Sequence, residues 1–286
     1  MKKFLIRTLS ATVYAALIVF AIYGRDIVNP NRPLVGFSIF VAITFLFAMI
    51  GVWEVYHNFA LAGKSSDKVG GMVACALTFL VLSAANFYKF RFPEISLQMM
   101  AWLIIFAVWA CLPFRQLWRK DADPMETLGR TMLPLVWVVV PMLMLQFIGN
   151  RSLGLLMMVF VCTWANDTGA YLTGMAIGRH PLWQRHSPKK TWEGTLGGVV
   201  LCGVAAAFIG PLLVEGLAWW YWLLVALVCA VCGTLGDLVE SMFKRSCGVK
   251  DSGTIMPGHG GMLDRFDSIL LIAPFVAALI AFGSIL

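Results

Sequence analysis

Long apolar stretches alternate with short polar connections along nearly the whole chain. Most of these stretches reach about 20 residues, the length that an α-helix needs to cross the hydrocarbon core of a bilayer. We expect nine spans, at residues 5–23, 34–56, 70–87, 97–114, 131–148, 152–176, 195–214, 217–241 and 267–286. The pattern predicts an all-α, polytopic integral membrane protein with about nine transmembrane helices.

Composition agrees with this prediction and excludes a soluble domain. Hydrophobic residues make up 60% of the 286 residues and charged residues 13%, whereas soluble domains contain about 25% charged residues. The first stretch has a basic start, as a signal peptide also has, but no small-residue cleavage pattern follows it around Ile22-Tyr23-Gly24. We therefore interpret it as an uncleaved first span.

The lysines and arginines predict the orientation in the membrane. Cytoplasmic loops of membrane proteins carry an excess of these residues. With the N-terminus inside, 17 of the 22 lysines and arginines lie on inner connections. This bias predicts a cytoplasmic N-terminus and an outer C-terminus. Topology and anionic headgroups also account for the net charge of +7, so no nucleic-acid partner is expected.

The two halves of the chain differ in chemistry. Residues 1–130 are predicted to form N-terminal transmembrane helices and an amphipathic inner connection at 115–130, and their polar residues are mainly loop charges. Glu54, near the inner end of the second span, is the exception, and either a lipid headgroup or water would satisfy it. Residues 131–286 are predicted to form the half that carries an active site on the cytoplasmic side.

Span 152–176 carries a carboxylate far from its outer end. Asp167 lies 15 residues from the start of the span, which corresponds to about 22 Å at the rise of an α-helix. A carboxylate at this depth requires a cation, a metal ion or a water-filled cavity. The alternative is an aspartate that packs against a protein partner.

The inner loop that follows is basic. Ser187-Pro188 favours a turn. Donors suited to phosphate oxygens come directly afterwards, namely Lys189, Lys190 and the hydroxyl of Thr191. Topology alone also predicts a basic inner loop, so both interpretations stay open.

The end of span 217–241 places polar residues at helical spacing. Two carboxylates, a hydroxyl and an ammonium recur at i, i+3, i+4 and i+7, as Asp237, Glu240, Ser241 and Lys244. These positions share one face of a helix. A salt-bridged surface stripe is the alternative, but this stripe continues a span that has no other charge.

The next connection is rich in glycine and leads to two acids. Gly260 and Gly261 allow backbone N–H groups to approach an anion closely. Asp264 and Asp267 then open the last span, and their i, i+3 spacing puts both on one face at the helix N-terminus. One acid there can be only a cap, but two acids facing Asp237 predict a divalent-metal site. Oxygen ligands of this kind suit Mg²⁺ better than zinc.

One series of residues has the spacing of a known signature. It consists of Ser241, Lys244, Arg245, Lys250, Asp251, Pro257, His259, Gly260, Gly261, Asp264, Arg265 and Asp267. This series resembles the signature of the CDP-diglyceride synthetases, also called phosphatidate cytidylyltransferases. The pair Asn166-Asp167 and the segment 187–194 also resemble that family.

The resemblance implies a multi-pass enzyme of the bacterial inner membrane. Its activity would be transfer of the cytidylyl group of CTP to phosphatidic acid, which yields CDP-diacylglycerol and pyrophosphate. One or two Mg²⁺ ions and a homodimer are also implied. The lipid phosphate would attack the α-phosphate of CTP, so a covalent protein nucleophile is not needed.

We assign roles on this basis. Asp237, Asp264 and Asp167 are expected to bind metal, with Asp267 and Glu240 as additional ligands. The residues expected to contact CTP, pyrophosphate or the lipid headgroup are Lys189, Lys190, Thr191, Ser241, Lys244, Arg245, Lys250, Gly260, Gly261 and Arg265. The residues expected to be catalytic are Asp237, Asp264, Lys244, Arg245 and His259, of which His259 either positions a phosphate or acts as an acid.

Three other functions remain open. A secondary transporter also uses broken spans and buried carboxylates, but it predicts polar groups near mid-membrane and repeat-like halves. A CTP-dependent kinase of a polyprenol or phytol keeps CTP and changes the acceptor. A structural scaffold leaves the constellation of Asp237 and Asp264 unexplained.

Overall fold

The computed structural model describes residues 12–24, 33–91, 95–256 and 260–283. Within these residues, eight helices are long and apolar enough to cross a membrane, and Thr12–Gly24 forms a shorter apolar helix. The predicted all-α membrane architecture is therefore confirmed. The first predicted span, 5–23, lies partly outside the described residues, so the total of nine stays a prediction.

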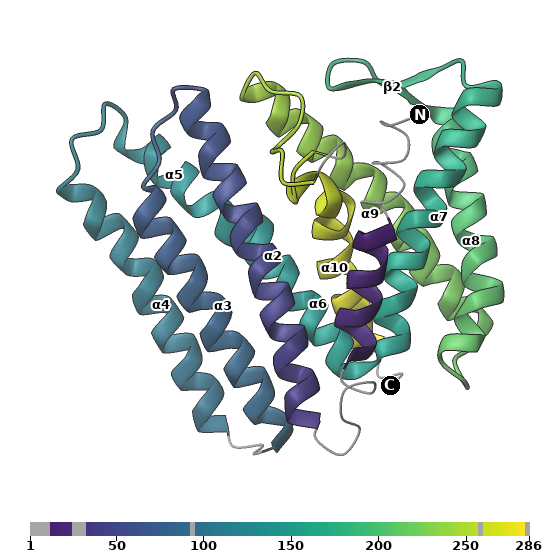
Figure 1. Ribbon diagram of the computed structural model, residues 1–286, viewed down its shortest axis with the longest axis horizontal. Helices are drawn as coiled ribbons and strands as arrows, with labels where there is room; N and C mark the ends of the chain where they lie inside the picture. Colours follow the sequence, from purple (N-terminus) through teal and green to yellow (C-terminus); the bar gives the residue numbers. More distant parts are fainter. Residues whose placement is uncertain (1–11, 25–32, 92–94, 257–259, 284–286) are drawn as a thin grey trace.

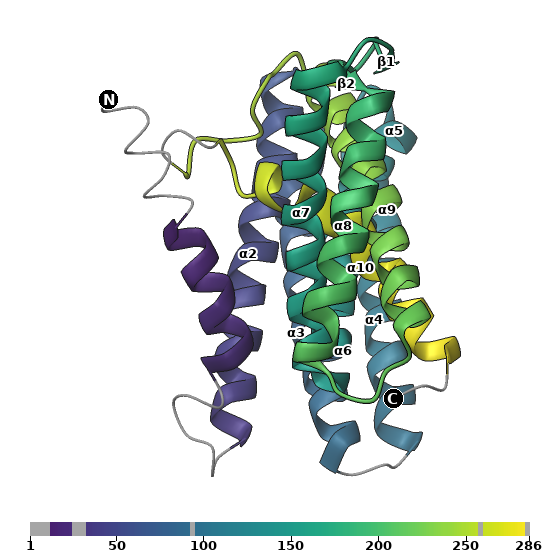
Figure 2. The ribbon, with the colours of Figure 1, turned by 90° about the vertical axis from the view of Figure 1, so that its right-hand side faces the viewer.

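The helices and strands follow one another in a simple order. Their bounds are α2 Pro33–Leu61, α3 Lys68–Arg91, α4 Ile95–Leu117, α5 Pro124–Pro134, a π-helical turn η1 Leu135–Val139, α6 Val140–Arg151, α7 Leu153–Ile177, β1 Pro181–Trp183, β2 Ser187–Thr191, α8 Trp192–Leu213, α9 Trp219–Ser246 and α10 Leu263–Gly283. Across the bundle, α4 and α3 form one edge, α2, α6 and α10 the middle, and α9, α7 and α8 the other edge (Figure 1). The helix Thr12–Gly24 lies beside α2 (Figure 2).

The helix that precedes η1 begins earlier than predicted. Asp123 caps α5 by accepting a hydrogen bond from the backbone N–H of Glu126, and Pro124 occupies the first helical turn. Both are ordinary helix-start signals. One span then runs from Pro124 to Arg151 through α5, η1 and α6. The predicted connection at 115–130 was thus too long, and the predicted division after residue 130 falls inside α5.

The last helix begins at Leu263, four residues before the hydropathy bound of 267, and its first turn contains Asp264. The predicted placement of Asp264 at the helix N-terminus is thereby confirmed. Hydropathy alone excludes this turn because its charged residues lower the local apolar content. The connection from α9 descends into the bundle, so α10 begins well below the end of α2 (Figure 1). The first turn of α10 therefore lies among other helices.

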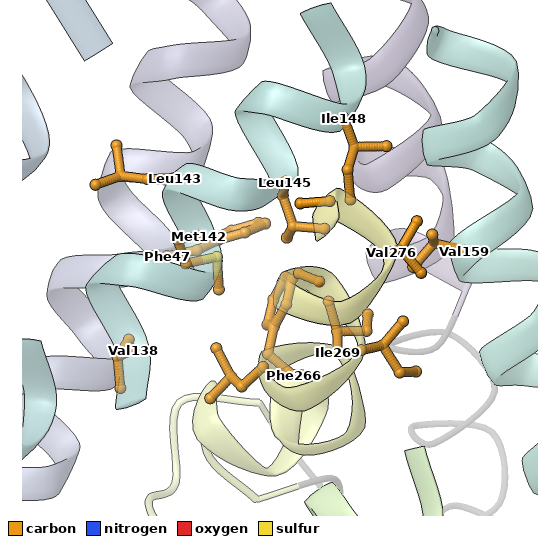
Figure 3. Close-up of a cluster of buried hydrophobic side chains, with 14 of the residues drawn as sticks. Phe47, Val138, Met142, Leu143, Leu145, Ile148, Val159, Phe266, Ile269 and Val276 are labelled. Carbon is orange, nitrogen blue, oxygen red and sulfur yellow. The ribbon is translucent and has the colours of Figure 1, made fainter. Parts of the chain in front are cut away.

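The core surrounds α10. Phe266 and Ile269 of α10 are buried against Phe47 of α2 and Met142 of α6 (Figure 3). The rings of Phe47 and Phe266 lie with centroids 5.3 Å apart. Because lipid tails are as apolar as these side chains, close packing holds membrane helices together more than a hydrophobic driving force does. Tight packing here fixes α10 laterally between α2 and α6.

Glycines allow α7 and α8 to approach each other closely. A Cβ atom on Gly169 would lie 2.7 Å from the carbonyl oxygen of Gly197, and one on Gly198 would lie 2.5 Å from Oδ1 of Asn166. Small residues at such crossings are typical of membrane helix pairs. The contact fixes the part of α7 that carries Asn166 and Asp167.

The loop between α7 and α8 forms a β-hairpin, which the sequence analysis did not predict. β1 pairs with β2 in antiparallel orientation, and Ser187 begins β2, so the turn precedes the expected position. Thr191 ends the hairpin and caps α8, because its Oγ1 accepts a hydrogen bond of 3.1 Å from the N–H of Gly194. Glu193 accepts hydrogen bonds from the N–H groups of Arg179 and His180, at 3.1 and 3.2 Å. The hairpin is thereby tied to both helices.

The glycine contact generates a stability prediction. Gly169→Ala should destabilise the protein by about 1–3 kcal/mol, because the added methyl group meets backbone that cannot move aside. Gly203→Ala is the matched control on α8, since its Cβ would meet nothing within 4 Å. Denaturation of both purified variants in detergent micelles measures the difference. Equal stability of the two variants would contradict the proposed packing.

Candidate active site

A cavity of about 470 Å³ opens between α7, the hairpin and α9. Asp167 of α7, Lys189 and Lys190 of β2, and Asp237 of α9 line it. These residues come from three segments that the sequence analysis singled out, namely span 152–176, the loop segment 187–194 and the end of span 217–241. The structure brings the three segments together at one end of the bundle.

Charges of opposite sign meet at the wall of this cavity. Nζ of Lys190 lies 2.5 Å from Oδ2 of Asp237 and 3.4 Å from the carbonyl oxygen of Thr234. Lys189 is exposed and has no such partner among the described residues. Asp167 faces the cavity, as expected for a carboxylate that needs water or a cation. The cavity therefore offers two ammonium groups and two carboxylates to a ligand.

Three carboxylates gather beside the cavity, and one of them, Asp237, lines it. Oxygens of Asp237, Glu240 and Asp267 lie within 4.8 Å of one another, and the hydroxyl of Ser241 donates a hydrogen bond of 3.3 Å to Asp237. Glu240 is completely buried. Its Oε1 has no hydrogen-bond partner among the described residues. Asp237 and Asp267 are half-buried. Clustered carboxylate oxygens of which one is buried without a hydrogen-bond partner fit a hard divalent cation such as Mg²⁺.

Lys244 links this cluster to the start of α10. Its ammonium group forms ion pairs with Glu240, one helical turn away, and with Oδ1 of Asp264 at 2.7 Å. The predicted stripe on α9 is confirmed, because Ser241 and Lys244 bond with acids of the same face. Arg245 points elsewhere: it is exposed and donates to the carbonyl oxygen of Val249 at 3.1 Å.

Asp264 is held by protein groups on both oxygens. Besides Lys244 on Oδ1, its Oδ2 accepts hydrogen bonds from the N–H of Ser252 at 2.9 Å, the hydroxyl of Ser252 at 2.9 Å and the N–H of Gly261 at 2.7 Å. The anion that Gly261 approaches is thus Asp264 itself. Gly260 has a φ of 82° and leaves no room for a Cβ beside Asp264. Metal binding by Asp264 and ligand binding by the glycines stay predictions.

The sequence analysis missed the role of Glu54. This carboxylate is completely buried and accepts hydrogen bonds from the N–H groups of Met262 at 2.8 Å and Leu263 at 2.7 Å. The hydroxyl of Ser252 donates to it at 3.0 Å. The expectation that Glu54 meets a headgroup or water was wrong, because protein donors satisfy it. Its position as an acid inside an apolar span was the available signal.

The other predicted residues are more dispersed. Lys250 is exposed in the connection after α9, and Arg265 is half-buried in the first turn of α10. The carbonyl oxygen of Arg265 accepts a hydrogen bond of 3.2 Å from the hydroxyl of Tyr14. Thr191 lines the cavity while it caps α8. His259 lies outside the described residues.

Comparison with known proteins identifies the family. Residues 5–282 match the model of a family described as the cytidylyltransferase family. The chain belongs to this family. The predicted resemblance is thereby confirmed.

Individual relatives carry a more specific name. A phosphatidate cytidylyltransferase of Bacillus subtilis is 34% identical over 246 residues, which cover 84% of this chain and 89% of that protein. Proteins of the same name from Staphylococcus epidermidis and Staphylococcus haemolyticus are 46% and 45% identical over 139 residues, or 48% of this chain. The chain spans about half the length, 53%, of these two staphylococcal relatives.

Two adjacent cations of this cytidylyltransferase family member, Lys244 and Arg245, should differ in their contribution to stability. Lys244→Met should destabilise the protein by about 3–5 kcal/mol, because it leaves the buried Glu240 and Asp264 without their shared partner. Arg245→Met is the matched control and should change stability by less than about 0.5 kcal/mol, as exposed positions do. Denaturation in detergent without added divalent cation checks both values. A similar loss in the two variants would refute the assignment of Lys244 as the buried partner.

Proposed function

We propose that this protein transfers the cytidylyl group of CTP to phosphatidic acid and produces CDP-diacylglycerol and pyrophosphate. The observation that carries the proposal is the cluster of Asp237, Glu240 and Asp267 beside a cavity with Lys189 and Lys190 in its wall. Membership of the cytidylyltransferase family and the name of the Bacillus subtilis relative support the same reaction.

The reaction requires little covalent chemistry from the protein. An oxygen of the lipid phosphate attacks the α-phosphorus of CTP, and the bond from this phosphorus to the oxygen that bridges to the β-phosphate breaks. Pyrophosphate leaves with the bonding electrons. Because a phosphate monoester is largely ionised at neutral pH, the attacking group needs no general base. Positioning and charge neutralisation are then the main contributions of the protein.

The lysines of β2 are suited to the triphosphate. Lys189 is exposed at the cavity, and Lys190 is held there by its ion pair with Asp237. An ammonium group acts on phosphate oxygens as a compact positive charge. We assign these two lysines to CTP and to the departing pyrophosphate.

We further propose that Asp237, Glu240 and Asp267 hold one Mg²⁺ ion, with Asp167 facing the same cavity and Asp264 one turn before Asp267. When bound, the ion neutralises negative charge on the phosphates. Glu240 is suited to this role because its Oε1 is buried without a hydrogen-bond partner among the described residues. A second ion and a homodimer remain proposals based on family membership.

The location of the site supports access by both substrates. It lies where α9 ends and α10 begins, at the same end of the bundle as the basic hairpin (Figures 1 and 2). An end with many lysines and arginines is expected to face the cytoplasm. We therefore propose that CTP enters from the cytoplasm and phosphatidate from the inner leaflet of a bacterial inner membrane.

The decisive assay uses purified protein with labelled CTP, phosphatidate and Mg²⁺. We expect label in a lipid-soluble CDP product, and none after Mg²⁺ is removed with a chelator. Phosphorylation of a polyprenol without CDP-lipid would favour the lipid-alcohol kinase. Solute or ion flux in proteoliposomes without product would favour a transporter. Either result would overturn the proposed function.

Two single substitutions test the acidic residues. Asp237→Asn and Asp264→Asn should each lower kcat by about 100-fold or more, since loss of several kcal/mol of charge stabilisation is expected. Glu126→Gln removes an exposed carboxylate from α5 and is the control, with unchanged activity. Rates are compared per amount of folded protein recovered by size exclusion. Full activity of either aspartate variant would refute its assignment.

A further inference from the structure

The first turn of α10 receives its cap from a distant helix. The first N–H groups of a helix have no partner within the helix, and a side chain just before the helix usually provides one. Here Glu54 of α2 accepts from Met262 and Leu263, 208 and 209 residues further along the chain. A buried carboxylate at a helix N-terminus also interacts favourably with the helix dipole.

Ser252 couples this cap to the site. Its hydroxyl lies 3.0 Å from Oε2 of Glu54 and 2.9 Å from Oδ2 of Asp264. A hydroxyl has one proton, so it donates to one of the two carboxylates at a time. Nδ2 of Asn58 donates to the carbonyl oxygen of Ser252 at 2.8 Å and to that of Glu54 at 2.9 Å. Ser252 is therefore fixed by α2 through both its side chain and its backbone.

The surrounding backbone leaves no space around the Glu54 carboxylate. A Cβ on Gly253 would lie 2.5 Å from Oε1 of Glu54, and a Cβ on Gly261 would collide with both carboxylate oxygens. The two glycines thus allow the connection between α9 and α10 to close around the acid. Glu54, Asn58, Ser252, Gly253 and Gly261 together are called the α2 clamp below.

The clamp continues into the acidic cluster through direct contacts. One oxygen of Asp264 accepts hydrogen bonds from Ser252 and Gly261. The other oxygen pairs with Lys244, which also pairs with Glu240. Asp267 follows Asp264 by one helical turn on α10. The depth at which α10 starts therefore determines where Asp267 lies relative to the acids of α9.

We propose that Glu54 is a positioning residue of the active site: the α2 clamp fixes the start of α10 and thereby aligns Asp264 and Asp267 with Asp237 and Glu240 of α9. The kinetic part of this inference rests on the proposed function. The metal-affinity part rests on the proposed cation site and not on the identity of the reaction, and protection of the first turn of α10 rests on neither.

The carboxylate itself is required. Glutamine has nearly the same shape, but its NH₂ group would face an N–H of Met262 or Leu263, so one buried donor loses its acceptor. Such a loss costs about 1–3 kcal/mol. Glu54→Gln is therefore the sharpest single change.

Asp67 offers a matched control. It is also a buried carboxylate near the start of a helix, where it accepts from the N–H of Gly70 at 3.1 Å and pairs with Arg119 at 3.4 Å. It caps α3, and its described contacts do not include the acidic cluster. Asp67→Asn should lower stability without an effect on metal binding.

The experiment measures metal binding, amide protection and kinetics in wild type, Glu54→Gln and Asp67→Asn, each as folded protein in detergent. Mn²⁺ serves as the probe for binding by electron paramagnetic resonance. In Glu54→Gln we expect Mn²⁺ affinity to fall, and the Mg²⁺ concentration for half-maximal activity to rise, by about 10–100-fold, as after loss of a group that orients metal ligands. Hydrogen exchange at Met262 and Leu263 should accelerate. Asp67→Asn should leave all three unchanged.

The possible outcomes distinguish a positioning role of Glu54 from a role as a helix cap only. Faster exchange in Glu54→Gln with wild-type Mn²⁺ affinity and Mg²⁺ dependence makes Glu54 a cap only and overturns the inference. Weaker Mn²⁺ binding in Glu54→Gln alone supports it, even if wild type forms no CDP-lipid and the proposed function fails. Where Glu54→Gln does not fold, Ser252→Ala is the second variant. It removes the bridging hydroxyl and keeps the hydrogen bonds from the N–H groups of Met262 and Leu263 to Glu54. It should shift Mn²⁺ affinity in the same direction, and an unchanged affinity would overturn the inference.

Discussion

The structure depends on one constraint, which is that a carboxylate inside a membrane-spanning bundle must be met by a cation, a metal ion or hydrogen-bond donors. Glu54 meets it with backbone N–H groups, Asp264 with donors and Lys244, and Asp237 with Lys190. Each solution joins different elements of the fold. These contacts connect α2, the hairpin, α9 and α10, in addition to the apolar packing of the core.

In the described ion pairs, the acidic cluster has more carboxylates than cations. Among the described ion pairs, Lys190 and Lys244 serve Asp237, Glu240 and Asp264, while Asp267 adds a further carboxylate to the cluster. In a site of low dielectric such a surplus is expensive. This surplus supports the proposed cation site and, through it, the proposed reaction on phosphates.

Local patterns could be predicted from the sequence, whereas long-range contacts could not. The helical spacing of Asp237 to Lys244 predicted their common face, because this spacing depends only on the geometry of one helix. Hydropathy placed the start of α10 at residue 267, and the i, i+3 spacing of Asp264 and Asp267 placed it correctly before Asp264. Neither pattern could show that α2 satisfies the backbone of this first turn. No spacing rule relates Glu54 to Leu263. Hydropathy could only mark Glu54 as an acid that needed a partner.

The position of Glu54 is itself set by buried polar contacts of α2. The hydroxyl of Tyr56 donates to the carbonyl oxygen of Thr131 at 2.6 Å, and Thr44 accepts from Nε2 of Gln146 at 3.0 Å. Hydrogen bonds of this kind hold membrane helices in register, where lipid offers no alternative partners. They attach α2 to the span of α5 and α6 on both sides of Glu54. The proposed alignment of the acidic cluster therefore rests on α2 of the first half of the chain, although that half carries none of the predicted ligands.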